Sequence, residues 1–180
     1  AGVGRAFSEQ GTGLRVGFAS INQGSKTVDS VSSPGALITG VRKFAGSDRS
    51  KFFESLYEHP IPASGTPLRR ALDDVGQYFS RDDNNGPWGE SPGANDTSAH
   101  LACRQSYNIL MTDGYWNGAG APTSSGSVNA TNADNKSGPT ITGPDNKSYQ
   151  YTAVNPYQGL NGDNSQQNDT LADVAMYYWN

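Results

Sequence analysis

The sequence predicts an α/β fold in which a mostly parallel sheet is flanked by helices. Apolar and polar residues alternate over residues 14–21, which is the period of a strand. A second short apolar run, residues 107–111, ends abruptly at Thr112-Asp113-Gly114. Helical stretches lie between these two predicted strands and after the second. Strands that alternate with helices are typical of parallel sheets.

The first half of the chain contains three further predicted elements. Residues 23–35 are rich in Ser, Gly and Asp and predict an exposed loop or a loose hairpin. A short strand is expected at residues 40–44. A helix is predicted over residues 47–58, because its apolar residues share one face and Pro60 and Pro62 follow its end.

The next helix has the clearest signals in the sequence. Thr66 is expected at its N-cap and Pro67 at its first position, where the missing N–H of proline costs nothing. Apolar residues then follow at helical spacing and form one stripe, namely Leu68, Ala71, Leu72, Val75 and Phe79.

A polar connection, residues 80–99, leads to the predicted central strand. Its Asp82-Asp83-Asn84-Asn85-Gly86 run resembles a calcium loop superficially, but the Gly comes one position early and no glutamate closes the loop. We therefore interpret it as turn chemistry. Asp113 follows the strand at residues 107–111, and open α/β sheets bind ligands at the carboxyl ends of their strands. Asp113 is thus the first candidate for chemistry.

The remainder contains a long tract rich in Gly, Asn and Ser, an insertion over about residues 115–168. An Asp-Asn-Lys-Ser run occurs at residues 134–137 and again at 145–148, and Tyr149 and Tyr151 beside the second copy predict a β-hairpin. A last helix is expected after the insertion, capped by Thr170 together with Asp173.

Composition limits the classes of function. The 180 residues suit a single domain. Residues 1–104 carry eleven basic and eleven acidic side chains, whereas residues 105–180 carry two Lys and six Asp. This acidic, Asn-rich second part argues against nucleic acid and fits bound cations or simply a soluble exterior. No apolar run is long enough to span a membrane.

Cys103 is the only cysteine, so the chain cannot form an internal disulfide. We interpret Cys103 first as a buried free thiol, second as one half of a bridge to a segment outside the chain, and third as a catalytic thiol. The chain begins at Ala1 instead of an initiator Met, which predicts a processed or trimmed piece of a longer polypeptide.

Two motifs about 47 residues apart carry a resemblance to a known family. Ser64-Gly65-Thr66-Pro67-Leu68 opens a helix and Leu110-Met111-Thr112-Asp113-Gly114 ends a strand, a pairing similar to the second and third metal-site motifs of a von Willebrand factor A domain. Five longer sequence segments resemble the N-terminal A-type domain of the PilC/PilY family of type IV pilus tip-associated adhesins. These segments are residues 15–22, 65–72, 103–107, 111–117 and 170–179.

The resemblance implies a Rossmann-like von Willebrand factor A-type domain at the bacterial cell surface, at the pilus tip or associated with the outer membrane. It implies roles in pilus biogenesis, attachment and surface sensing, with minor pilins and host or abiotic surface ligands as partners. Residues 1–180 would form a single partial domain, incomplete at both ends. The family's first metal motif, Asp-x-Ser-x-Ser, is missing and would lie upstream of Ala1, and the chain is expected to stop before the family's final strand and helix. Asp29-Ser30-Val31-Ser32-Ser33 has Val where the first Ser is needed.

The metal site expected from the resemblance consists here of Thr66 and Asp113, which offer a hydroxyl and a carboxylate to Mg²⁺ or Ca²⁺. Because the chain supplies only two ligands, we expect low occupancy of this site by Mg²⁺ or Ca²⁺. Each residue also has a simpler interpretation, Thr66 as a helix cap alone and Asp113 as a turn residue alone. Tyr115 and Trp116, just beyond the turn, are expected either as adhesive contacts with a partner or as packing beneath the long loop.

No pattern in the sequence predicts an enzyme. His59 and His100 fall in no zinc or catalytic spacing, and Asp73 and Asp74 are expected on a solvated helix surface. The favoured function is a pilus-tip adhesion module. A metal-dependent protein-binding A domain of a secreted or surface protein unrelated to pili is the alternative, and a hydrolase is a distant third.

Overall fold

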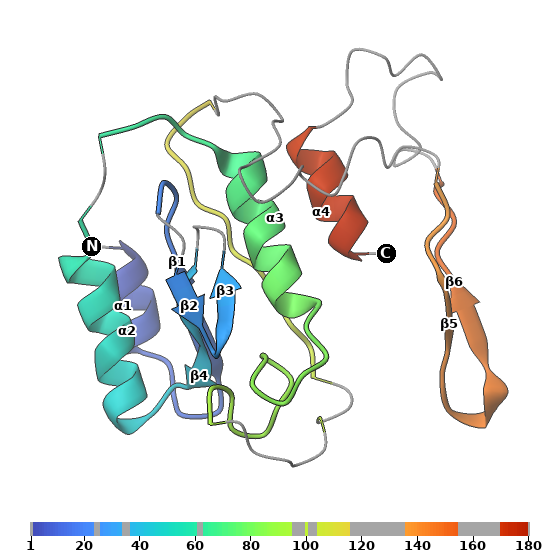
Figure 1. Ribbon diagram of the computed structural model, residues 1–180, viewed down its shortest axis with the longest axis horizontal. Helices are drawn as coiled ribbons and strands as arrows, with labels where there is room; N and C mark the ends of the chain where they lie inside the picture. The colour runs from blue at the N-terminus through green and yellow to red at the C-terminus, as the bar shows by residue number, and fades with distance from the viewer. Residues whose placement is uncertain are drawn as a thin grey trace.

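The computed structural model describes residues 2–23, 26–33, 37–60, 63–94, 100, 104–115, 136–154 and 170–179 (Figure 1). The N-terminal part contains α1 (Gly2–Ser8), β1 (Arg15–Ala19), β2 (Lys26–Val28), β3 (Val31–Ser33), β4 (Leu37–Lys43), α2 (Gly46–Glu58) and α3 (Leu68–Phe79). The C-terminal part contains β5 (Thr140–Thr142), the 3-10 turn η1 (Pro144–Asn146), β6 (Ser148–Gln150) and α4 (Leu171–Trp179).

The described strands form three two-stranded antiparallel sheets, which pair β1 with β4, β2 with β3, and β5 with β6. The prediction of a mostly parallel, Rossmann-like sheet of the von Willebrand factor A type is therefore wrong for the described residues. Parallel neighbours need a long crossover, usually a helix. Here the β2–β3 hairpin joins β1 to β4, so the chain returns antiparallel to β1.

The predicted central strand is the second correction. Residues 104–115 form neither helix nor strand, and no described strand pairs with them. Tyr107, Ile109 and Met111 are 79%, 72% and 67% exposed. A central strand has neighbours on both edges and buries its side chains, and neither condition holds here. The apolar run alone could not supply those neighbours.

The core of the N-terminal part lies between the strands and two helices. Figure 1 shows α1 and α2 on one side of the strands and α3 on the other. Phe7, Phe44 and Phe52 form a ring cluster with centroids 4.9 to 6.0 Å apart. Phe44, at the end of β4, is only 1% exposed. This cluster explains why α2 forms where its apolar face predicts it.

The helices were predicted better than the sheet. The expected helices near residues 47–58 and 170–179 correspond to α2 and α4. The capping prediction for α4 is confirmed, because Thr170 Oγ1 accepts a hydrogen bond from Asp173 N at 3.1 Å and Asp173 Oδ2 accepts one from Thr170 N at 2.9 Å. The cap predicted for α3 is wrong, because that helix begins at Leu68 with Pro67 as its N-cap.

Two hairpins were also anticipated. The β2–β3 pair agrees with the loose hairpin considered for residues 23–35, and the β5–β6 pair agrees with the hairpin predicted beside Tyr149. Within the described ranges, no helix combines the length and apolar character needed to cross a bilayer. Cys103, Trp116 and most of the predicted insertion lie outside the described residues.

Asp73 and Asp74 are not solvated as expected, since each is only 3% exposed. Asp73 accepts hydrogen bonds from the Tyr178 hydroxyl at 2.8 Å and from Gln77 Nε2 at 2.7 Å. A Cβ on Gly76 would collide with the Tyr178 ring, so glycine lets α4 approach α3 closely. Asp73 and Gly76 therefore join α3 to α4 and do not face solvent.

Candidate functional site

The two predicted metal ligands lie on the loops where the sequence places them. Thr66 precedes α3, is half-buried, and its carbonyl accepts a hydrogen bond from Leu68 N at 2.9 Å. Asp113 lies in an exposed bend. Figure 1 shows the start of α3 and the end of segment 104–115 at the same end of the molecule. Direct contact between the side chains of Thr66 and Asp113 stays a prediction.

The donor set around these two residues is small. Across the described part of the chain, no three His, Cys, Asp or Glu side chains gather in a way that could hold a metal ion. Ca²⁺ takes six to eight oxygen ligands, and Mg²⁺ takes six, several of them water. Thr66 and Asp113 offer two. The described residues therefore do not fit a tightly bound cation by themselves.

The turn that carries Asp113 is held by its own side chains. Gly114 N donates to Thr112 Oγ1 at 3.3 Å, and the same hydroxyl lies 3.2 Å from the Gly114 carbonyl oxygen. Tyr115 follows and is 99% exposed. Its ring is accessible to a partner, as a contact residue requires. Burial of Tyr115, the second reading of this residue, does not occur in the structure.

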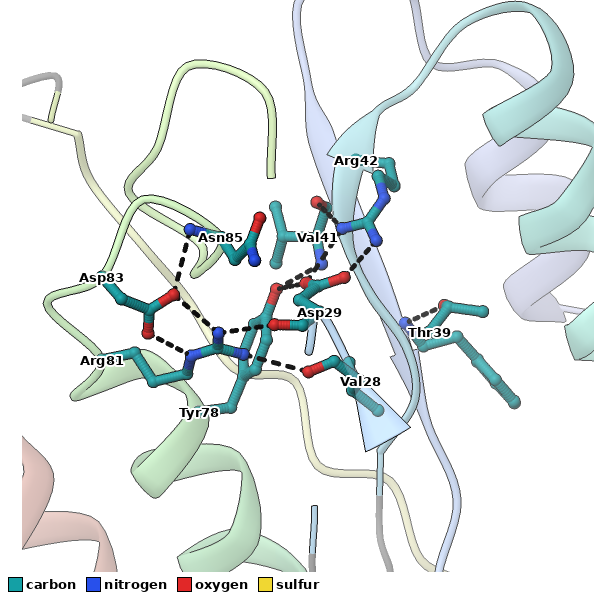
Figure 2. A network of polar contacts seen from close by, with 10 residues as sticks. Val28, Asp29, Thr39, Val41, Arg42, Tyr78, Arg81, Asp83 and Asn85 are labelled. Carbon is teal, nitrogen blue, oxygen red and sulfur yellow. Dashed lines mark hydrogen bonds and ion pairs between the residues drawn. The ribbon is translucent and has the colours of Figure 1, made fainter. Parts of the chain in front are cut away.

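A different residue, Asp29, lies within a network of polar contacts (Figure 2). It occupies the tip of the β2–β3 hairpin, where Asp29 and Ser30 have φ of 53° and 67°. Two consecutive residues with positive φ are typical of the type I′ turn, whose twist matches that of a hairpin. The Asp29 side chain is 2% exposed, so its charge needs partners inside the protein.

Arg42 and Tyr78 supply those partners. Arg42 donates to Asp29 Oδ2 from Nη1 at 3.1 Å and to Oδ1 from Nη2, which makes a bidentate pair. The Tyr78 hydroxyl donates to Asp29 Oδ2 at 3.0 Å and accepts from Val41 N at 2.8 Å. The hydrogen bond to Asp29 raises the pKa of Arg42. Burial, and secondly the charge of Asp29, raises the pKa of Tyr78 far above its ordinary value.

Arg81 holds the hairpin from the end of α3. It donates to the carbonyl oxygens of Val28 and Asp29 at 3.1 and 2.8 Å. It also binds both carboxylate oxygens of Asp83 at 2.8 Å, and this hydrogen bonding lowers the pKa of Asp83. Asn85 N donates to Asp83 Oδ1 at 3.0 Å. These contacts support turn chemistry, and not calcium binding, for residues 82–86.

Glycines and a cavity surround this network. A Cβ on Gly40 would lie 2.7 Å from the Tyr78 hydroxyl, and Gly93 has a φ of +81° beside Arg42. A cavity of about 270 Å³ adjoins the Asp29–Arg42 pair and extends toward Asp48 and Lys51 of α2. Its charged lining is balanced, with two acids and two bases. Asp29 is satisfied by its partners, so we interpret the network as an anchor for the hairpin.

Two local signals in the sequence are consistent with this anchor. Tyr78 lies seven residues after Ala71 and therefore shares the apolar stripe of α3, but the predicted stripe omitted it. Asp29-Ser30 between Val28 and Val31 is a two-residue turn between β-branched residues, which is a hairpin signal. Asp29 lies in the predicted loop or hairpin of residues 23–35 and in the incomplete metal motif, and neither prediction includes its burial. The contact with Arg42 could not be predicted from spacing.

Comparison with known proteins connects the whole chain to one kind of protein. The chain is 35% identical over 174 residues, 97% of its length, to the type IV pilus biogenesis factor PilY1 of Pseudomonas aeruginosa strain PAK. It is 35% identical over 176 residues to the protein of the same name from strain PAO1. The match to strain UCBPP-PA14 is 33% identical over 76% of the chain.

The chain spans only 13% of the length of the PAK and PAO1 proteins. No protein-family model matches the chain, and no solved structure matches it. These relatives are described as type IV pilus biogenesis factors. Over almost its full length, the chain is thus related to a short segment of PilY1, a bacterial type IV pilus biogenesis factor.

Proposed function

We propose that this chain is a module of a PilY1-like protein and acts at the tip of a type IV pilus, in pilus biogenesis, surface attachment and surface sensing. The observation that carries the proposal is 35% identity over 97% of the chain to PilY1. The similarity favours a pilus protein over an A domain unrelated to pili. Minor pilins, together with host or abiotic surface ligands, are the proposed partners.

The exposed end of segment 104–115 is the proposed contact surface for a pilus partner. Tyr115 is 99% exposed and follows a turn closed by Thr112 and Gly114. Tyrosine combines apolar area with a hydroxyl group and is enriched at the energetic centres of interfaces. Trp116, which lies outside the described residues, extends the same proposal.

We further propose that Thr66 and Asp113 contribute to a cation site that is completed only when other oxygen ligands join them. The support is the pair of motifs and the position of both loops at one end of the molecule (Figure 1). A partner carboxylate could provide one such ligand. The chain alone should then bind Mg²⁺ or Ca²⁺ weakly.

The pilus role is tested in the full-length protein of the host bacterium. Deletion of the coding region for these residues should abolish or strongly reduce surface piliation, twitching and attachment. Replacement of Tyr115 and Trp116 by Ala should reduce attachment while the protein is still made. Wild-type piliation and adhesion after the deletion would contradict the proposal.

The cation role is tested by calorimetric titration of the chain with MgCl₂ and CaCl₂. Weak binding that disappears in Asp113→Ala and in Thr66→Ala supports it. Asp145→Asn is a matched control, because Asp145 is an exposed carboxylate in the β5–β6 turn, outside the proposed site. Identical heats for wild type and Asp113→Ala would exclude a metal role for that carboxylate.

A further inference from the structure

The cavity of about 270 Å³ beside the Asp29–Arg42 pair has the composition of a small-molecule site. Residues of β1, β2, β4 and α2 line it, so elements that are separate in the sequence build its walls. The volume holds several water molecules or one small organic molecule. Sites for small ligands usually combine an apolar lining with a few polar groups. The apolar part of this lining consists of Val16, Val28, Ile38 and Phe52.

The charged side chains of the cavity form two sets. Asp29 and Arg42 neutralise each other through their bidentate contact, which Figure 2 shows. Asp48 and Lys51 lie three residues apart on α2, so they occupy neighbouring positions on one face of the helix. Neither of these two side chains has a hydrogen bond or an ion pair with any residue that the structure describes. Asp48 and Lys51 are therefore an acid and a base with which a ligand can pair.

Arg42 also retains unused donors. A guanidinium group has five N–H donors. Nη1 uses two of them, toward Asp29 Oδ2 at 3.1 Å and the Val41 carbonyl oxygen at 2.9 Å, and Nη2 uses one toward Asp29 Oδ1. The pKa of Arg42 is raised mainly by its hydrogen bond to Asp29, and the charge of Asp48 contributes as well. Asp48 thus lies within electrostatic reach of Arg42, on the same cavity.

A ligand that carries both charges fits this lining better than a ligand that carries one. A simple cation would pair with Asp48 but would also lie near Lys51, and a simple anion would meet the reverse situation. An unmatched charge that leaves water is costly, whereas an ammonium and a carboxylate group in one molecule match both side chains. The two groups must lie close together, because Asp48 and Lys51 are less than one helical turn apart. The apolar wall favours an apolar side chain in the same molecule.

We propose that this cavity binds a free α-amino acid with an apolar side chain. Asp48 accepts hydrogen bonds from the α-ammonium group of the ligand. Lys51 and the unused N–H groups of Arg42 donate to its α-carboxylate group. The apolar side chain of the ligand packs against Ile38 and Phe52. This site is independent of the role of the chain at the pilus, because it is built only from the lining of the cavity.

The test is a two-dimensional NMR titration of the ¹⁵N-labelled chain with L-leucine. L-Leucine should bind with a dissociation constant below about 10 mM and shift the amide signals of residues 38–40 and 48–52. Leucinamide lacks the carboxylate group and 4-methylpentanoate lacks the ammonium group. Each of these analogues should bind about tenfold more weakly than L-leucine, because one charged side chain of the cavity then loses its partner.

Two variants assign the two charges of the ligand. Asp48→Asn should weaken L-leucine binding about tenfold but leave 4-methylpentanoate within about threefold of its affinity for wild type. Lys51→Gln should weaken L-leucine binding about tenfold but leave leucinamide within about threefold. Glu54→Gln is the matched control, because Glu54 is an exposed acid of the same helix and does not line the cavity. Thermal unfolding of each variant shows whether the fold is intact.

Three outcomes would overturn this assignment. The first is the absence of binding by L-leucine, L-valine and L-phenylalanine up to about 50 mM, which would leave a cavity filled by water only. The second is equal affinity for L-leucine and both analogues. The third is a loss in Glu54→Gln as large as that in Asp48→Asn. Normal piliation after deletion of the coding region would contradict only the pilus role, since amino-acid binding is measured on the isolated chain.

Discussion

Several aromatic side chains are buried within residues 2–94, whereas several are exposed within residues 104–115 and 136–154. In the first region, Phe44 and Phe52 are buried in a cluster of rings. In the second, Tyr107, Tyr115 and Tyr149 are 79%, 99% and 62% exposed. Aromatic side chains give the largest gain when buried, so their exposure is costly unless something covers them. Substitution of the buried rings should therefore reduce stability more than substitution of the exposed ones.

Two aspartates, one from each region, differ in the same way. Asp29 is buried and receives hydrogen bonds from Arg42 and Tyr78, whereas Asp113 lies in an exposed bend. A buried carboxylate that loses its partners destabilises the protein, but an exposed one affects stability little. Substitutions in the two regions should therefore separate effects on stability from effects on binding.

Asp29→Ala should have the largest effect on stability. It leaves Arg42 and the Tyr78 hydroxyl without their acceptor and detaches the β2–β3 hairpin from β4. We expect a loss of about 3 kcal/mol, at the low end of the range for a broken buried pair because the Arg42 side chain is 30% exposed. Urea denaturation of the chain, followed by circular dichroism, measures it.

Asp113→Ala is the control for that experiment and should change stability by less than about 0.5 kcal/mol. Equal losses in the free energy of unfolding for the two variants would contradict the difference proposed between the buried and the exposed aspartate. A small loss for Asp29→Ala would show that the hairpin anchor contributes little to the fold.

Gly40→Ala should have the next largest effect. The added Cβ would lie 2.7 Å from the Tyr78 hydroxyl, within the network around Asp29. Overpacking of this kind costs about 1–3 kcal/mol. At Gly13 an added Cβ meets no atom within 4 Å, so Gly13→Ala should be close to neutral. Thermal unfolding of both variants measures the effect. Equal melting temperatures would show that position 40 does not require a residue without a Cβ.

The network also predicts a loss of stability at alkaline pH. The pKa of Tyr78 is raised in the folded chain, whereas an unfolded tyrosine titrates near pH 10. Above about pH 10 the folded state therefore binds more protons than the unfolded state, and the free energy of unfolding falls as pH rises. Urea midpoints between pH 8 and 11 measure this slope.

Tyr78→Phe is the control for the alkaline effect. It should be less stable than wild type by about 1–2 kcal/mol at pH 8, because Asp29 and Val41 N each lose a hydrogen-bond partner. Its stability should then depend less steeply on pH above 10. The same slope in both proteins would assign the alkaline loss to other groups.

The elements that could be predicted from the sequence are those whose signals are local. The capping of α4 by Thr170 and Asp173 involves residues three apart and is confirmed. The sheet depended on long-range pairing. The short apolar run of residues 107–111 predicts a strand but not the strands that would pair with it, and the expected central parallel strand is wrong. The Asp29–Arg42 pair could not be foreseen for the same reason.

Tyr115→Ala should have the smallest effect on stability. Its side chain is 99% exposed, so truncation removes almost no buried area, and we expect a change below about 0.5 kcal/mol in urea denaturation. The same substitution in the full-length protein should still reduce attachment to a surface if Tyr115 contacts a partner. Tyr57→Ala, on a 63% exposed tyrosine of α2 that stacks on Phe53, tests whether exposure alone explains the result. A stability loss at Tyr115 as large as that at Asp29 would mean that Tyr115 is covered in the protein. Normal attachment of the Tyr115→Ala protein, with unchanged stability, would show that Tyr115 does not contribute to binding.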